Sequence, residues 1–156
     1  MNVRLLLASA VLLLAAACAP RNIPGTQIPD TDDSRAILKV MEQYRVAIEA
    51  RDARAIQQLV SKSFRDNAGT EDPEDDLTYD NLPQALPALL SRLESPRVDL
   101  DIRQVDLKKN GVATVIYYWN ASWRVPGLLD RPQRESELEQ MHLQKEDNQW
   151  RIVSGF

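Results

Sequence analysis

Cysteine and histidine are nearly missing from this chain of 156 residues, which contains one of each, Cys18 and His142. A single cysteine cannot form a disulfide bond within the chain, so a disulfide-stabilised scaffold is excluded. One histidine and one thiol also leave mainly carboxylates as metal ligands, and we expect no metal site. The chain contains no phosphate-binding loop, no dinucleotide-binding glycine fingerprint and no serine in the context of a hydrolase nucleophile. We therefore expect no cofactor.

Runs of basic residues are also absent. The formal net charge is −4, and it becomes −5 (18 basic and 23 acidic residues) if residues 1–17, which include Arg4 and no acidic residue, are removed. Proteins that bind nucleic acids in general present a basic face to the phosphates. We therefore expect no nucleic-acid partner.

The first seventeen residues have the composition of an export signal. One basic residue, Arg4, precedes an apolar run from Leu5 to Ala17. The run is too short to cross a bilayer comfortably, but it has the length of a signal-peptide core. We therefore divide the chain into a signal peptide (1–17), a flexible tether with three prolines and one glycine (18–33) and a single domain (34–156).

The end of this signal, Leu14-Ala15-Ala16-Ala17-Cys18, resembles the bacterial lipoprotein signal, in which the cysteine is acylated and becomes the new N-terminus. The resemblance implies lipid attachment at Cys18 and a membrane anchor that does not span the bilayer. The same resemblance implies the periplasmic face of the outer membrane as the location, because Ala19, and not an aspartate, follows the cysteine. Cleavage by an ordinary signal peptidase at the Ala-x-Ala pattern of Ala15 and Ala17 remains an alternative.

The first part of the domain predicts three helices. Apolar residues recur at helical spacing from Ile37 to Ile48, Asp33 or a close neighbour is the expected cap, and a second short helix follows a break at Asp52. A third helix should begin at a cap on Asp80 and run to Leu93, bent or split at Pro87. Between the second and third helices, residues 65–80 form a polar stretch. Its acidic cluster at 71–76 lacks the spacing of a calcium loop and is interpreted as a solvated loop.

The second part of the domain changes to a period of two and predicts four strands. The phase slips near Arg103 and Gln104, which indicates a β-bulge, and Asn110-Gly111 predicts a hairpin. The remaining strands are expected at 112–123, 134–145 and 149–154, with a loop at 124–133. Helices followed by consecutive antiparallel strands define an α+β domain, a curved four-stranded sheet packed against three N-terminal helices.

The order of these elements, together with the phrases AIEARD at the helix break and WRIVSG in the last strand, resembles the nuclear transport factor 2-like superfamily. This superfamily includes SnoaL-like and ketosteroid-isomerase-like domains, and the resemblance spans residues 34–156. It implies a cone-shaped domain, often with a cavity at its open end, and dimerisation through the outer sheet face in many members.

The resemblance to ketosteroid isomerases gives two catalytic candidates. Tyr44 stands where their helical tyrosine donates to the oxyanion, and Asp72 resembles the loop aspartate that removes the proton. The strand acid that completes their oxyanion site is missing, because the matching position falls at or near Met141. The only histidine, His142, lies on the opposite strand face from Met141, so we expect it on the outer sheet surface.

The aromatic face of the second strand suggests a ligand pocket, although the same side chains could fill the cone as core. The predicted pocket residues are Tyr44, Phe64, Tyr117, Trp119, Trp123 and Met141. The leading hypothesis is a membrane-anchored periplasmic lipoprotein whose domain binds, without catalysis, a small apolar ligand or a protein partner. The alternatives are a proton-transfer enzyme that uses Asp72 and Tyr44, and a homodimeric interaction module with Tyr118 and His142 at the outer-face contact.

Overall fold

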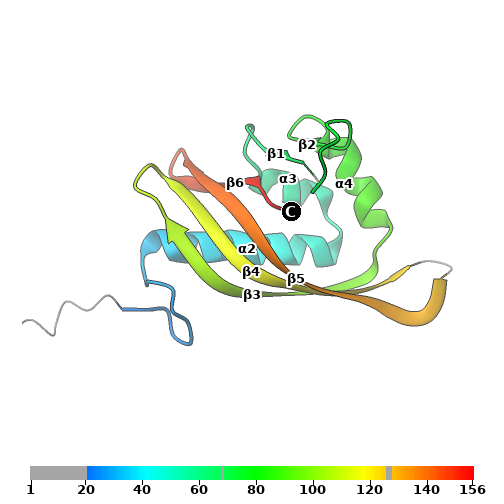
Figure 1. The fold of residues 1–156 in the computed structure, drawn as a ribbon, viewed down its shortest axis with the longest axis horizontal. Helices are drawn as coiled ribbons and strands as arrows, with labels where there is room; N and C mark the ends of the chain where they lie inside the picture. The colour runs from blue at the N-terminus through cyan, green and yellow to red at the C-terminus, as the bar shows by residue number, and fades with distance from the viewer. Residues whose placement is uncertain (1–20, 68, 126–127) are drawn as a thin grey trace, which may run out of the picture.

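The computed structural model describes residues 21–67, 69–125 and 128–156. Its helices are α2 (Asp32–Ala50), α3 (Ala53–Leu59) and α4 (Leu82–Ser91), and a pair of two-residue strands, β1 (Arg65–Asp66) and β2 (Leu77–Thr78), lies between α3 and α4. The strands β3 (Glu94–Leu107), β4 (Val112–Val125), β5 (Leu128–Glu146) and β6 (Gln149–Ser154) form one antiparallel sheet in that order. The α+β fold class is therefore confirmed (Figure 1).

The predicted signal peptide and the proposed lipid-attachment residue, Cys18, lie outside the described ranges. Within those ranges, no helix combines the length and the apolar character that a membrane span requires.

Helix α2 begins and ends where side-chain and backbone chemistry can satisfy its terminal groups. The hydroxyl of Thr31, not the carboxylate of Asp33, accepts from the backbone N–H of Ser34 at 3.0 Å. After α2 the chain turns at Arg51, whose φ of 55° is left-handed, and Asp52 then accepts from the N–H groups of Arg54 and Ala55. The predicted break at Asp52 is confirmed.

Helix α4 is not split at Pro87, and its cap differs from the expected one. It runs without interruption through Pro87, which is exposed on the solvent side, where water can solvate the carbonyl group that proline cannot pair. Its N-terminal cap position is Asn81 and not Asp80. The side chain of Asn81 bonds to the N–H of Thr78 and the carbonyl of Asp76, so it closes the preceding loop instead of capping the helix.

The sheet confirms the predicted bulge, because the pairing of β3 with β4 shifts between Ile102 and Gln104. The hairpin at Gly111 is also confirmed, and the φ of this residue is 74°. The loop predicted at 124–133 is wrong for most of its length. Strand β5 already begins at Leu128, which pairs with Val125, and the β4–β5 hairpin extends beyond the helices (Figure 1).

Residues 21–31, which the sequence predicts as part of the tether, are folded in the structure. Asn22 and Pro29 form a β-bridge, and the N–H of Ile23 donates to the carbonyl of Ile28 at 2.9 Å. The side chain of Ile28 belongs to the hydrophobic core and is only 2% exposed. A buried isoleucine holds this segment against the domain, so the described part of the predicted tether is not a free spacer.

Polar contacts join α2 to the edge strand β3 and to the β5–β6 hairpin. At the edge strand β3, Glu49 accepts from the N–H of Val98 at 2.9 Å, and Arg45 lies 3.4 Å from the carbonyl of the same residue. At the other side, Asp33 accepts from Lys145 Nζ at 2.7 Å and from Trp150 Nε1 at 3.0 Å. Glu49 and Arg45 cover the exposed edge of β3. The contacts of Asp33 fix the start of α2 to the β5–β6 hairpin.

Replacing Asp33 with alanine should lower the free energy of unfolding by about 1–2 kcal/mol, because a buried indole N–H loses its acceptor and a lysine loses its ion pair. Urea denaturation would measure the loss. Asp32→Ala is the matched control, since Asp32 lies in the same helix turn but is exposed. Equal losses in the two variants would mean that the helix terminus, and not this contact, is responsible.

Candidate functional site

A cavity of about 240 Å³ lies between α2, the β4–β5 pair and the segment after β6. Four aromatic and three acidic residues line it: Tyr44, Tyr117, Trp119, Glu135, Glu137, Glu139 and Phe156. The volume is somewhat below the roughly 300 Å³ at which sites for drug-sized ligands begin. The cavity therefore suits a small molecule.

The aromatic rings form a wall centred on Tyr44. Its ring centroid lies 5.5 Å from that of Phe156 in a stacked arrangement and 6.4 Å from that of Trp119 in a tilted one. Tyr44 is only 4% exposed, and its hydroxyl has no hydrogen bond to another residue in the part of the chain that the structure describes. No fully buried polar side-chain atom in that part lacks a partner, so the hydroxyl must contact the cavity space.

Phe156 is held in the wall by two backbone contacts. Asp66 accepts from the N–H of Gly155 at 2.6 Å and from that of Phe156 at 3.3 Å. Gly155 has a φ of +93°, and a Cβ atom there would lie 2.1 Å from the carbonyl oxygen of Gln140. Only glycine fits this approach, which places the ring of Phe156 between Tyr44 and Phe64.

The three glutamates occupy alternate positions of β5 and therefore share one face of the sheet. Glu139 pairs with Tyr117, and Glu137 pairs with Trp119, in the β4–β5 register. Burial raises the pKa of Glu139, and the neighbouring charges of Glu137 and Glu135 raise it further. Burial also raises the pKa of Tyr44 and of Tyr117, so both hydroxyls stay protonated at neutral pH.

The structure brings together only part of the predicted site. Tyr44, Tyr117 and Trp119 line the cavity, and Phe64 contacts it indirectly through Phe156. Met141 is completely buried in the core, and Trp123 packs against the core while standing outside the lining.

The two residues of the proton-transfer hypothesis are not brought together in this cavity. Asp72 is exposed in the loop between β1 and β2, where it accepts from the N–H of Glu74 at 2.9 Å. It is not among the residues that line the cavity with Tyr44. The carboxyl group that does share the cavity with Tyr44, and whose pKa is shifted, is that of Glu139.

Sequence reasoning missed the glutamates and Phe156. A signal for the glutamates was present, because Glu139, Glu137 and Glu135 continue the same period of two backwards from the buried Met141. For Phe156 no local signal exists, since its position depends on Asp66, which is 90 residues earlier in the chain.

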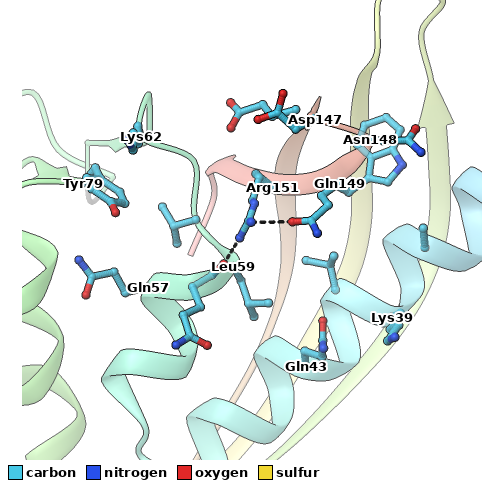
Figure 2. A pocket seen from close by; sticks show the side chains of 16 residues that line it. Lys39, Gln43, Gln57, Leu59, Lys62, Tyr79, Asp147, Asn148, Gln149 and Arg151 are labelled. Carbon is cyan, nitrogen blue, oxygen red and sulfur yellow. Dashed lines mark hydrogen bonds between the residues drawn. The ribbon is translucent and has the colours of Figure 1, made fainter.

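A larger but open groove, of about 940 Å³, lies between α2, α3 and the β5–β6 hairpin (Figure 2). Arg151 crosses it and donates to the carbonyl of Gln58 and to Gln149 Oε1. Its cationic side chains do not converge, because Lys39 and Lys62 lie on opposite sides of the groove (Figure 2). The two lysines therefore do not form one cationic site in this groove.

The outer sheet face carries the histidine, as predicted. His142 lies 3.2 Å from Thr114 Oγ1 and 3.1 Å from Gln140 Nε2, and both partners belong to the same face. Within residues 21–67, 69–125 and 128–156, no group of three or more histidine, cysteine or acidic residues has the arrangement to hold a metal ion.

No protein-family model and no curated protein sequence matches this chain. Solved structures do match. The nuclear transport factor 2 (NTF2-like) superfamily protein from Salmonella enterica aligns with a TM-score of 0.64 and 16% identity, over 79% of this chain and 89% of that one. A conserved protein from Planctomyces limnophilus aligns at 0.67 and 10%, over 79% and 92%. The Kfla4162 protein from Kribbella flavida aligns at 0.68 and 12%, over 79% and 87%.

Similarity at these identities shows the fold alone. The domain has the nuclear transport factor 2-like fold, three helices followed by a four-stranded antiparallel sheet. Because this fold carries many unrelated activities, the function must be argued from the cavity.

Replacing Glu139 with glutamine should raise the thermal midpoint near pH 7 and leave it almost unchanged near pH 4. Burial and the neighbouring carboxylates hold the folded-state pKa of Glu139 above its value in an unfolded chain. Protonated Glu139 therefore stabilises the folded state at pH values below the unfolded-state pKa. This stabilisation is lost as the pH rises through the folded-state pKa, whereas glutamine stays neutral at both pH values. Thermal denaturation at the two pH values measures the difference. Glu71→Gln, which removes a charge from the exposed loop, is the control, and an equal gain there would refute the explanation.

Proposed function

We propose that the domain binds a small organic molecule in the cavity between α2 and the β4–β5 pair. The observation that carries the proposal is the hydroxyl of Tyr44, which sits on a side chain that is only 4% exposed, has no described hydrogen-bond partner and contacts the cavity. Because this hydroxyl reaches the cavity space, a ligand that accepts from it would gain a directed hydrogen bond in addition to its apolar contacts.

The aromatic side chains would supply most of the binding energy. Tyr117, Trp119 and Phe156 offer apolar surface with few rotatable bonds, and Tyr44 adds a fixed donor. The contact of Asp66 with the backbone of Phe156 holds one of these rings in place before a ligand arrives. Such a preformed wall reduces the ordering cost of binding.

The cellular address forms a second part of the proposal. The apolar run from Leu5 to Ala17 followed by Cys18 supports export and lipidation, with the binding domain held at the periplasmic face of a bacterial membrane. In this arrangement the protein would capture its ligand close to the membrane surface.

Amide-resonance NMR with p-cresol as the probe tests binding. We expect saturable shifts at Tyr117, Trp119 and Glu139, and Glu137→Trp should weaken them at least about ten-fold by filling the cavity mouth. Leu138→Trp is the matched control, because Leu138 is the next residue of β5, lies on the opposite face and is 60% exposed. Shifts centred on the groove beside Arg151, or equal effects of the two tryptophans, would contradict the proposal.

Expression of the full chain in a bacterial host tests the anchor. The wild-type protein should sediment with membranes and incorporate labelled palmitate, whereas Cys18→Ser should do neither, because the serine cannot accept the lipid through a thioether. A variant that still sediments and remains unprocessed would instead indicate an uncleaved apolar anchor. A wild-type protein that is soluble after export would support ordinary cleavage after Ala17.

A further inference from the structure

The cavity contains more negative charge than its surroundings balance. Glu135, Glu137 and Glu139 all line it, and no basic residue is part of the lining. None of the three forms a salt bridge with another residue in the described part of the chain. Three carboxylates spaced two residues apart on one strand face repel one another, so the cavity has a field that favours a cation.

Each of two carboxylates lies beside an aromatic residue of the neighbouring strand. Tyr117 is directly opposite Glu139, and Trp119 is directly opposite Glu137, so their Cβ atoms are about 4.5–5.5 Å apart. The rings of Tyr44 and Phe156 close another side of the same space. Aromatic faces attract cations through the negative charge of the π system, and this attraction is strongest at tryptophan and where water is excluded.

We propose that the ligand of this cavity is an organic ammonium cation, with its charged head held against Trp119 and Tyr44 and countered by Glu137 and Glu139. This inference rests on the proposed function and adds the chemical class of the ligand to it. Tyr44 supplies the observation that is independent of the acids. Its side chain is only 4% exposed, and its hydroxyl, which has no hydrogen bond to another described residue, contacts the same space. It can donate to a hydroxyl or carbonyl group that the cation carries.

A metal ion is the competing occupant of an acidic site. The described residues contain no group of three or more acidic, histidine or cysteine side chains placed to hold a metal. Calcium needs six to eight oxygen ligands at 2.3–2.6 Å. Four of the seven residues that line the cavity are aromatic, which suits an alkylated ammonium group better than a hard cation.

Two probes of equal shape isolate the role of charge. Choline carries a trimethylammonium group, and 3,3-dimethylbutan-1-ol replaces its nitrogen with carbon and is neutral. Titrations of the exported protein near pH 7 and low salt should show that choline binds at least about ten-fold more tightly than the alcohol. The double variant Glu137→Gln/Glu139→Gln, which keeps the shape of both side chains and removes their charge, should lose most of this preference.

The control removes the same charge elsewhere. Glu71→Gln/Glu74→Gln changes two exposed glutamates of the loop between β1 and β2, and it should keep the preference for choline. Equal binding of the two probes, or tighter binding of the alcohol, would overturn the cationic class while leaving small-molecule binding intact. Binding of neither probe would also overturn it, and the p-cresol titration would then decide the proposed function separately. Calcium that displaces choline at equal concentration would assign the site to a metal.

Discussion

The register in which β4 pairs with β5 is the constraint on which both the core and the cavity depend. Val115 faces Met141, and Tyr117 faces Glu139, on the same side of the sheet. Because side chains alternate along a strand, a slip of one residue would move all of them to the outer face. The slip would bury the outward residues, which include His142, and would expose a completely buried methionine. Burial of the apolar residues on this face therefore fixes the register of the two strands, and the register fixes the position of the glutamates.

The cavity exists because the inward face of β5 changes from apolar to acidic along its length. Leu143 and Met141 are completely buried, while Glu139 is half-buried and Glu137 is exposed. Carboxylates without cationic partners cannot be packed into a dry core, because their desolvation would cost several kcal/mol each. The core therefore ends at Met141, and the space beside the glutamates stays open to a small molecule and to water.

Much of the fold could be predicted from the sequence, because the decisive signals are local. The break at Asp52, the bulge near Gln104 and the hairpin at Gly111 each depend on a few adjacent residues. The errors arose where distant contacts override local preference. Ile28 lies in a segment rich in proline, yet burial in the core holds it against the domain. The wrong helix cap has a local cause instead, because Asn81 bonds to Thr78 and Asp76 and closes the loop before α4.

The cavity was only half predictable for the same reason. Tyr44, Tyr117 and Trp119 are apolar enough to be assigned to the inside from periodicity. Glu139 was not, since an alternating row of glutamates normally indicates a solvated strand face. What turns that row into a cavity wall is Phe156, which is placed there by Asp66 and by the absence of a Cβ atom at Gly155.

The groups that line the cavity can gain interactions when a ligand binds. Burial and neighbouring charges oppose the ionised form of Glu139, and the hydroxyl of Tyr44 lacks a described partner. Within the described residues every fully buried polar side-chain atom has a partner, so these groups at the cavity are accessible and can interact with a ligand. A ligand that neutralises the carboxylates and accepts from Tyr44 would stabilise the domain in proportion to its affinity. Tight binding and increased stability would then have one physical origin, the neutralisation of the carboxylates of β5.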